Sequence, residues 1–238
     1  HAALMIGGFF GTVIGIERAV ALHTRWAWGS PAASAAGGLA LAGGAWQAGA
    51  WLLVTGGLVF VAAGVEILRR QRAAHTAVLL LAALCGAGAA LAWALGATGE
   101  GTLAAWLAFL VLTIAAERLE MTRLMRRRPG ARTAFAAAVA GVLLSLPLFA
   151  RDARAGGIVF GLSLVALAAW LVRHDIARVT LGARGLSRYM AVALLAGYGW
   201  LGLGGVAWAA TALSQPARDA ALHAIGLGFV FSMVMAHA

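Results

Sequence analysis

The chain has 238 residues, of which 63% are hydrophobic and 11% are charged. A soluble domain of this length cannot bury so much apolar surface, so the composition excludes soluble enzymes and soluble binding modules. The formal net charge of +10 comes from 18 arginines without any lysine, which invites a nucleic-acid-binding interpretation. The arginines lie in short segments between apolar runs, and they therefore indicate membrane topology and no nucleic-acid partner.

Apolar runs long enough to cross a bilayer recur along the whole chain and are separated by glycine, proline and arginine. We expect an all-α, polytopic transmembrane helical bundle that forms a single domain over residues 1–238. The chain begins at a histidine and ends inside an apolar segment, so we also expect it to be a fragment of a longer protein. The nine predicted helices cover residues 1–22, 31–48, 51–68, 75–97, 101–121, 132–149, 156–177, 188–212 and 218–238.

The arginines separate the two sides of this predicted bundle. Fifteen, including Arg123 and the run Arg126-Arg127-Arg128, lie in or beside the loops after the first, third, fifth and seventh helices. The other three are Arg151, Arg154 and Arg218. This positive-inside bias places residue 1 outside and the arginine-rich loops in the cytoplasm, as in a bacterial-type inner membrane. The tryptophans that then lie near the membrane interfaces are Trp26, Trp28, Trp46, Trp51 and Trp208.

Two histidines in the last apolar run are the most informative candidates for function. His223 and His237 are separated by fourteen positions, which on a straight α-helix places them within about 40° on one face and about 21 Å apart along the axis. Ionisable residues are costly inside a membrane, so two imidazoles on one helix face indicate a metal, haem or proton site. The same stripe carries Gly226, Val230 and Met233.

The first predicted helix carries a similar pattern. Its stripe combines a histidine with small residues, as a flat porphyrin lying against a helix requires, and consists of His1, Met5, Gly8, Thr12 and Gly15. His1 and His223 lie at equal predicted depth, so they could supply two axial ligands to one haem or two ligands to a copper ion. The alternative is that the glycines serve helix packing and each histidine bonds a neighbouring group.

The remaining histidines, His23, His75 and His174, lie at predicted cytoplasmic helix ends among arginines. We expect them to be solvated side chains at the membrane interface.

Two Glu-Arg pairs lie at the cytoplasmic ends of the first and fifth predicted helices. Adjacent residues on an α-helix point about 100° apart, so we expect that Glu17 does not face Arg18 and that Glu117 does not face Arg118. Pairing between the two helices would satisfy all four groups. Such a layer serves either as a structural ion-pair lock or as a point of proton uptake, since a desolvated glutamate can titrate near neutral pH.

The segment His1-Ala-Ala-Leu-Met5-Ile-Gly-Gly8-Phe9 resembles the His-x3-Met-x2-Gly/Phe-Phe helix that carries a haem ligand in haem-copper oxidases and NnrS-type membrane proteins. The segment His223-Ala-Ile-Gly-Leu-Gly-Phe is similar to the late-helix histidine of NnrS. The resemblance implies an all-helical bundle in which His1 and His223 bind haem or copper and Met5 and Gly8 shape the pocket. It also implies biology linked to nitric oxide or to respiratory redox chemistry.

Three functions follow as hypotheses. The first is a haem or haem-copper membrane protein, with membrane oxidoreductase as its enzyme class, a redox partner or a small gaseous ligand, and an inner polar layer of His237, Glu17 and Glu117. The chain has no adjacent His-His pair and no His-x3-Tyr, which argues against a proton-pumping oxidase. The second hypothesis is a transporter that uses its intramembrane Glu, Arg and His groups. The third is a structural subunit of a membrane assembly.

Overall fold

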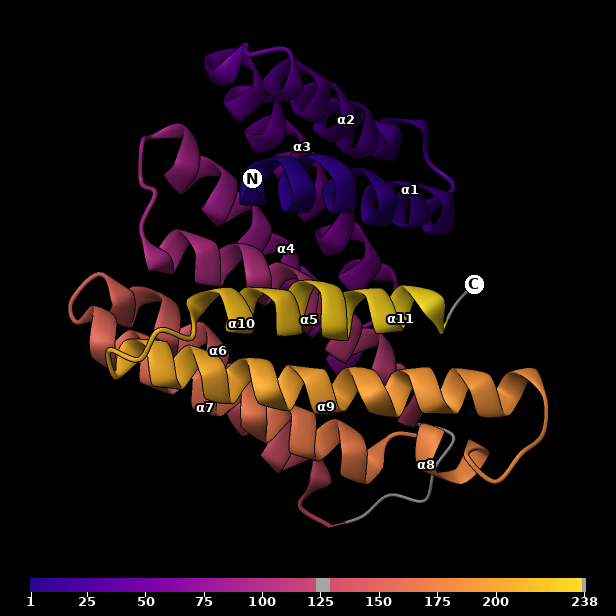
Figure 1. Cartoon of the computed structure of the whole chain (residues 1–238). Coiled ribbons are helices and arrows are strands. Elements are labelled where there is room, and N and C mark those ends of the chain that lie inside the picture. Colours follow the sequence, from indigo (N-terminus) through magenta and orange to yellow (C-terminus); the bar gives the residue numbers. More distant parts are fainter. Residues whose placement is uncertain (123–128, 237–238) are drawn as a thin grey trace. The chain divides into compact units, whose positions relative to one another are not determined.

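The computed structural model describes residues 1–122 and 129–236. The chain divides into two compact units, His1–Ala116 (unit 1) and Glu117–Ala238 (unit 2), and each is described by itself (Figure 1). The described residues form helices and no strand, which confirms the all-α prediction. Eight of the described helices are long and apolar enough to cross a membrane. The chain is therefore a multi-pass membrane protein.

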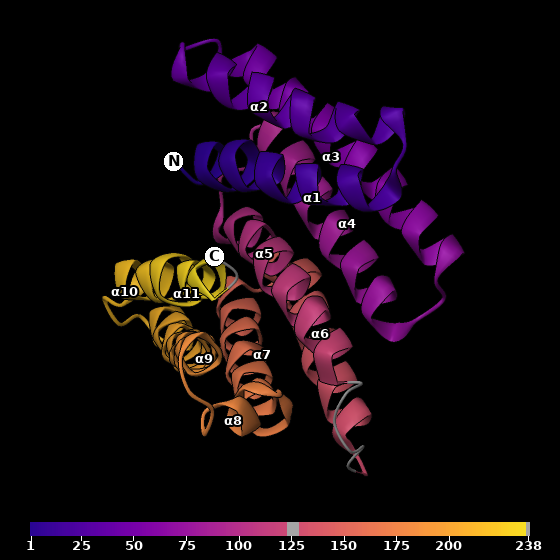
Figure 2. The same ribbon diagram turned by 90° about the vertical axis from the view of Figure 1, so that its right-hand side faces the viewer.

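Unit 1 contains the first helical rods of the chain. The first rod joins the π-helix η1 (Ala3–Phe10) to the α-helix α1 (Gly11–Leu22). α2 packs against both this rod and α3, and α3 packs against α4 (Figure 2). The later elements are the 3-10 helix η2 (Arg25–Trp28), α2 (Gly29–Ala42), α3 (Trp46–Arg70), α4 (Ala74–Ala94) and α5 (Glu100–Met121), whose last residues belong to unit 2.

Glycines bring the helices of unit 1 close together. A Cβ added to Gly8 would lie 3.1 Å from the Cα of Gly38, so the backbones of η1 and α2 touch at this point. A Cβ added to Gly37 would lie 2.9 Å from a methyl carbon of Leu53, where α2 meets α3. Within a membrane, close packing drives helix association because lipid is as apolar as the helix surface, so small residues are favoured at these contacts.

The predicted helix 31–48 differs most from the structure. α2 ends at Ala42 because two glycines follow, and Gly44 has a φ of +81°. Its 14 residues are too few to be counted among the eight spanning helices, since they cover about 21 Å of a hydrocarbon core about 30 Å thick. However, η2 precedes α2 directly, and the combined rod runs alongside α1 and α3 (Figure 1).

Unit 2 contains the later helices. α7 packs against α6 and α9, and α9 packs against the last rod. Where α7 packs against α9, a Cβ added to Gly161 would lie 2.5 Å from the carbonyl oxygen of Gly205, so the backbones of the two helices are in contact. The elements are α6 (Ala131–Phe149), α7 (Ala153–His174), α8 (Ala177–Thr180), α9 (Leu186–Ala212) and a last rod of α10 (Arg218–His223), the π-helix η4 (Ala224–Val230) and α11 (Phe231–Met235).

The tryptophans separate into two groups. Trp26, Trp28, Trp46 and Trp51 are exposed, as expected for rings near a membrane interface. Trp208 is not: it is buried, and its ring centroid lies 5.1 Å from that of Phe160 on α7. Helix periodicity does not show which side of α9 is covered by α7, so the burial of Trp208 was not foreseen, and its position near a membrane interface stays a prediction. Arg123 and the run Arg126-Arg127-Arg128 lie outside the described residues.

Candidate functional site

His223 is an exposed imidazole at the end of α10, directly before the π-helix η4. Its Nδ1 lies 2.7 Å from the carbonyl oxygen of Asp219. With the ring hydrogen on Nδ1, the imidazole donates to that carbonyl and its Nε2 keeps a free lone pair, which is the usual arrangement of a metal-ligating histidine. Three residues after His223, a Cβ added to Gly226 would meet no atom within 4 Å, so no other side chain covers the helix surface there. These features fit a flat cofactor approaching this helix.

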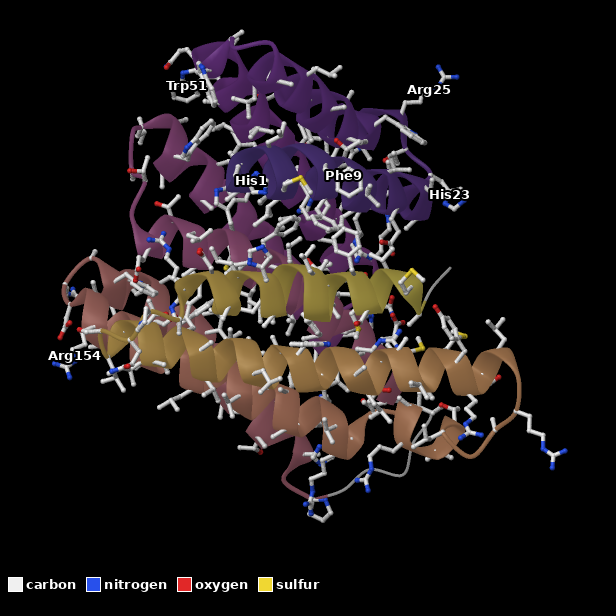
Figure 3. All side chains as sticks on the ribbon, viewed as in Figure 1. His1, Phe9, His23, Arg25, Trp51 and Arg154 are labelled. Carbon is white, nitrogen blue, oxygen red and sulfur yellow. The ribbon has the colours of Figure 1, made fainter. Side chains whose placement is uncertain are left out.

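His1 is likewise exposed and lies just before a π-helix, η1. Within unit 1, His1 and Trp51 lie toward one end and His23 and Arg25 toward the other (Figure 3). Met5 is half-buried, and its backbone N–H donates to the His1 carbonyl at 3.0 Å.

Three of the glycines that follow His1 face α2. Gly8 lies against Gly38, and a Cβ added to Gly11 would lie 3.2 Å from the Ser34 Oγ, while Gly15 faces Pro31 at 3.1 Å. Helix packing therefore uses the space that these missing side chains leave. That Gly8 also contacts a cofactor stays a prediction.

The two π-helices change the geometry that a straight α-helix implies. A π-helix closes i to i+5 hydrogen bonds, so its turns hold more residues, and later side chains are rotated relative to earlier ones. In the last rod, Val230 and Met233 are buried whereas His223 is exposed, so the predicted stripe does not stay on one face. His237 lies outside the described residues. π-helical turns are frequent at functional sites, which singles out the segments after both histidines.

His1 belongs to unit 1 and His223 to unit 2. The distance between their rings is therefore not defined, and their pairing stays a prediction. Among the described residues, no group of three or more His, Cys, Asp or Glu side chains could hold a metal ion. A site built from described residues would thus rely on one or two imidazoles, as haem ligation does.

The other three histidines differ in how far they are buried. His75 is buried near the start of α4, contrary to the prediction of a solvated side chain, although Arg72 and Ala74 beside it are exposed. His174 stacks on Trp170 with ring centroids 5.0 Å apart, and its Nδ1 lies 3.0 Å from the Trp170 carbonyl oxygen. His23 ends α1 in a left-handed conformation and is exposed.

The first Glu-Arg pair departs from the helical-wheel expectation. Arg18 Nη1 lies 3.8 Å from Glu17 Oε1, so adjacent residues do meet, because the long arginine side chain bends back across the helix surface. The Glu17 side chain is 58% exposed. Pairing of Glu17 with Arg118, or of Glu117 with Arg18, would join the two units and stays a prediction.

Unit 2 has a buried polar cluster that consists of Arg118, Asp175 and Tyr198. The residues come from α5, the segment after α7, and α9, and they are 8%, 1% and 0% exposed. Arg118 and Asp175 both lie within electrostatic and side-chain hydrogen-bonding range of the Tyr198 hydroxyl. Asp175 Oδ1 accepts a hydrogen bond of 2.8 Å from the Ala177 backbone, which holds the carboxylate at the start of α8.

Asp175 and Tyr198 each have a buried oxygen atom that could make a further hydrogen bond. Neither Asp175 Oδ2 nor the Tyr198 hydroxyl makes a direct hydrogen bond of good geometry, although both atoms are buried. Sequence reasoning identified Arg118 but missed its two neighbours. The available signals were an aspartate near the end of the predicted helix 156–177 and a tyrosine in the middle of the predicted helix 188–212. Such a cluster can lock helices together or hold and pass a proton.

The helices and these sites define the class of the protein, a multi-pass, all-helical membrane protein with histidines in its first and last spans and charged groups inside unit 2. The chain belongs to the family described as a domain of unknown function, DUF8744, whose model matches residues 1–238. No curated protein and no solved structure matches the chain.

Proposed function

We propose that this protein is an integral membrane protein that binds haem, or haem and copper, with His223 as a ligand. The observation that carries the proposal is the geometry of His223. Its ring is exposed on an apolar rod, its Nδ1 is held by the Asp219 carbonyl, and its Nε2 is free to coordinate iron. The bare surface at Gly226 leaves room for the edge of a macrocycle.

His1 is the proposed second ligand. It is exposed, it precedes a π-helix as His223 does, and both segments resemble the ligand-bearing helices of NnrS-type proteins. Bound haem would supply reversible redox chemistry and binding of a small gas such as nitric oxide. Met5 lies one turn from His1 and would border the cofactor, and His237 would belong to an inner layer.

The arginine distribution supports a position for this site at the outer side of the membrane. We place the arginine-rich loops in the cytoplasm of a bacterial-type inner membrane and both ligands at the outer side. The separation of His1 and Trp51 from His23 and Arg25 along unit 1 agrees with this arrangement (Figure 3).

The test is a reduced-minus-oxidised optical spectrum of the purified protein, with iron and copper quantified on the same sample. We expect haem bands with near-stoichiometric iron, and we expect that His223→Ala and His1→Ala each shift or abolish them. His174→Ala is the matched control, because that Nδ1 also lies against a helix carbonyl but the ring stacks on Trp170. A full, unchanged haem spectrum in both ligand variants would show that other residues bind the cofactor.

Proton-coupled transport is a second candidate, which the polar cluster favours. Asp175 Oδ2 and the Tyr198 hydroxyl are buried atoms without a direct hydrogen bond, and intramembrane groups of this kind mark proton pathways. The measurement is proton flux into vesicles that contain the protein and a pH-sensitive dye, driven by an imposed membrane potential. Colourless protein whose flux is lost in Asp175→Asn and retained in Glu17→Gln would favour transport over haem binding.

A further inference from the structure

Unit 1 has a small, partly open cavity between η1, α2, α3, α4 and α5, with a volume of about 30 Å³. It lies wholly within the first 116 residues and has no histidine in its lining. Any role it has is therefore independent of the proposed haem site.

Glycines and rigid rings create this space. The cavity wall includes Gly7, and a Cβ added there would lie 2.8 Å from the Trp106 ring. A Cβ on Gly86 would lie 3.0 Å from the Phe109 ring, which in turn packs edge-to-face on Phe60 at 5.7 Å. The glycines let the helices approach, and the planar rings are held in place by these contacts. The wall therefore cannot collapse into the space by a change of rotamer, as a flexible side chain would allow.

The size and polarity of the cavity select its occupant. One water needs about 10–15 Å³ by this measure of volume, together with two to four polar partners. The cavity has about twice that room. Apart from the indole N–H of Trp106, its polar side-chain groups are the hydroxyls of the buried serines Ser30 and Ser34, and both serines belong to α2. The rest of the lining is glycine, alanine, leucine and aromatic rings.

We infer that this cavity binds a small, uncharged, weakly polar molecule of two heavy atoms, of the class of dioxygen and nitric oxide. Such molecules dissolve in lipid and can reach a membrane-embedded cavity without crossing a polar surface. The length of a molecule of two heavy atoms fits the volume of the cavity. Its weak dipole suits a cavity wall that has serine hydroxyls on one side only.

The test uses dioxygen itself as the probe. The protein is labelled with 5-fluorotryptophan in lipid nanodiscs, and the fluorine relaxation of each tryptophan is measured with and without dissolved dioxygen, which is paramagnetic. Trp106 lines the cavity, whereas Trp208 does not, and both are 4% exposed. We expect the dioxygen-induced relaxation at Trp106 to exceed that at Trp208 several-fold.

Two variants on α4 separate cavity binding from dissolved gas in the surrounding lipid. Ala83→Val adds bulk at the cavity wall, and we expect it to remove the excess relaxation at Trp106. Gly88→Ala is the matched control, since its added Cβ meets no atom within 4 Å, and we expect the excess to persist. Equal relaxation at Trp106 and Trp208 in the unaltered protein would overturn the inference without any variant. So would an excess that a folded Ala83→Val protein retains.

Discussion

Units 1 and 2 are both built from apolar helices, but they treat polar groups differently. In unit 1 the Glu17 side chain is 58% exposed, and the cavity is lined by serine hydroxyls and aromatic rings without a charged group. In unit 2 Arg118 and Asp175 are buried together with a tyrosine. A cavity without charged groups depends on the shape of its wall, whereas a buried charged cluster depends on mutual compensation and is sensitive to the loss of any one partner.

The largest effect is expected from Asp175→Ala. This change leaves Arg118 buried without the nearby carboxylate and removes the hydrogen bond to Ala177. Removing one member of a buried charged group typically costs about 3–5 kcal/mol of unfolding free energy. The measurement is unfolding in mixed detergent micelles, followed by circular dichroism.

Glu17→Gln is the control for Asp175→Ala, because it removes a charge that is exposed and not buried. Its ion pair with Arg18 is long, at 3.8 Å, and largely exposed, so we expect a change of at most about 1 kcal/mol. Similar losses for the two variants would mean that the polar cluster of unit 2 has no special electrostatic role.

A smaller effect is expected from Gly161→Ala. The added methyl group would meet the Gly205 carbonyl oxygen at 2.5 Å and push α7 away from α9. Such overpacking usually costs about 1–3 kcal/mol. The equivalent change in unit 1, Gly8→Ala, meets Gly38 at 3.1 Å and should cost less.

Gly88→Ala completes the series of glycine variants, because it meets no neighbour and gains helix propensity of up to about 1 kcal/mol. The loss of unfolding free energy should therefore be largest for Gly161→Ala, smaller for Gly8→Ala and absent for Gly88→Ala. A reversed order would show that backbone proximity does not set the tolerance of these glycines.

The smallest effect is expected from Tyr198→Phe. The hydroxyl makes no direct hydrogen bond of good geometry, so its removal should change the unfolding free energy by less than about 1 kcal/mol. Proton flux in vesicles is the sharper readout. A stable Tyr198→Phe protein that has lost flux would identify the cluster as a proton pathway, whereas unchanged flux would leave it a structural lock.

Helix positions were predicted well because the length of an apolar run is a local property. The predicted helix 101–121 corresponds to Glu100–Met121, and 188–212 corresponds to Leu186–Ala212. The prediction for 31–48 was poorer, since alanine and glycine give little hydropathy signal and the glycine pair at 43 and 44 ends the helix early. The π-helices after His1 and His223 were not foreseen, because a straight α-helix was assumed for both stripes.

The candidate sites were predicted only in part. His223 could be singled out because an imidazole in an apolar run is unusual by itself. Asp175 and Tyr198 could not be linked, since they are 23 positions apart in the sequence and meet only because the segment after α7 lies beside α9. The contact of Arg18 with Glu17 depends on the side-chain conformation, which a helical wheel does not include.

The apolar runs were enough to predict that this chain spans a membrane and where most of its helices begin and end, because bilayer thickness and backbone hydrogen bonding act on each segment separately. Helix packing was needed to show which glycines contact another helix, that Trp208 is buried, that Arg118 shares its surroundings with Asp175 and Tyr198, and that unit 1 contains a cavity. Those features depend on the distance and rotation between packed helices, and no single segment specifies them.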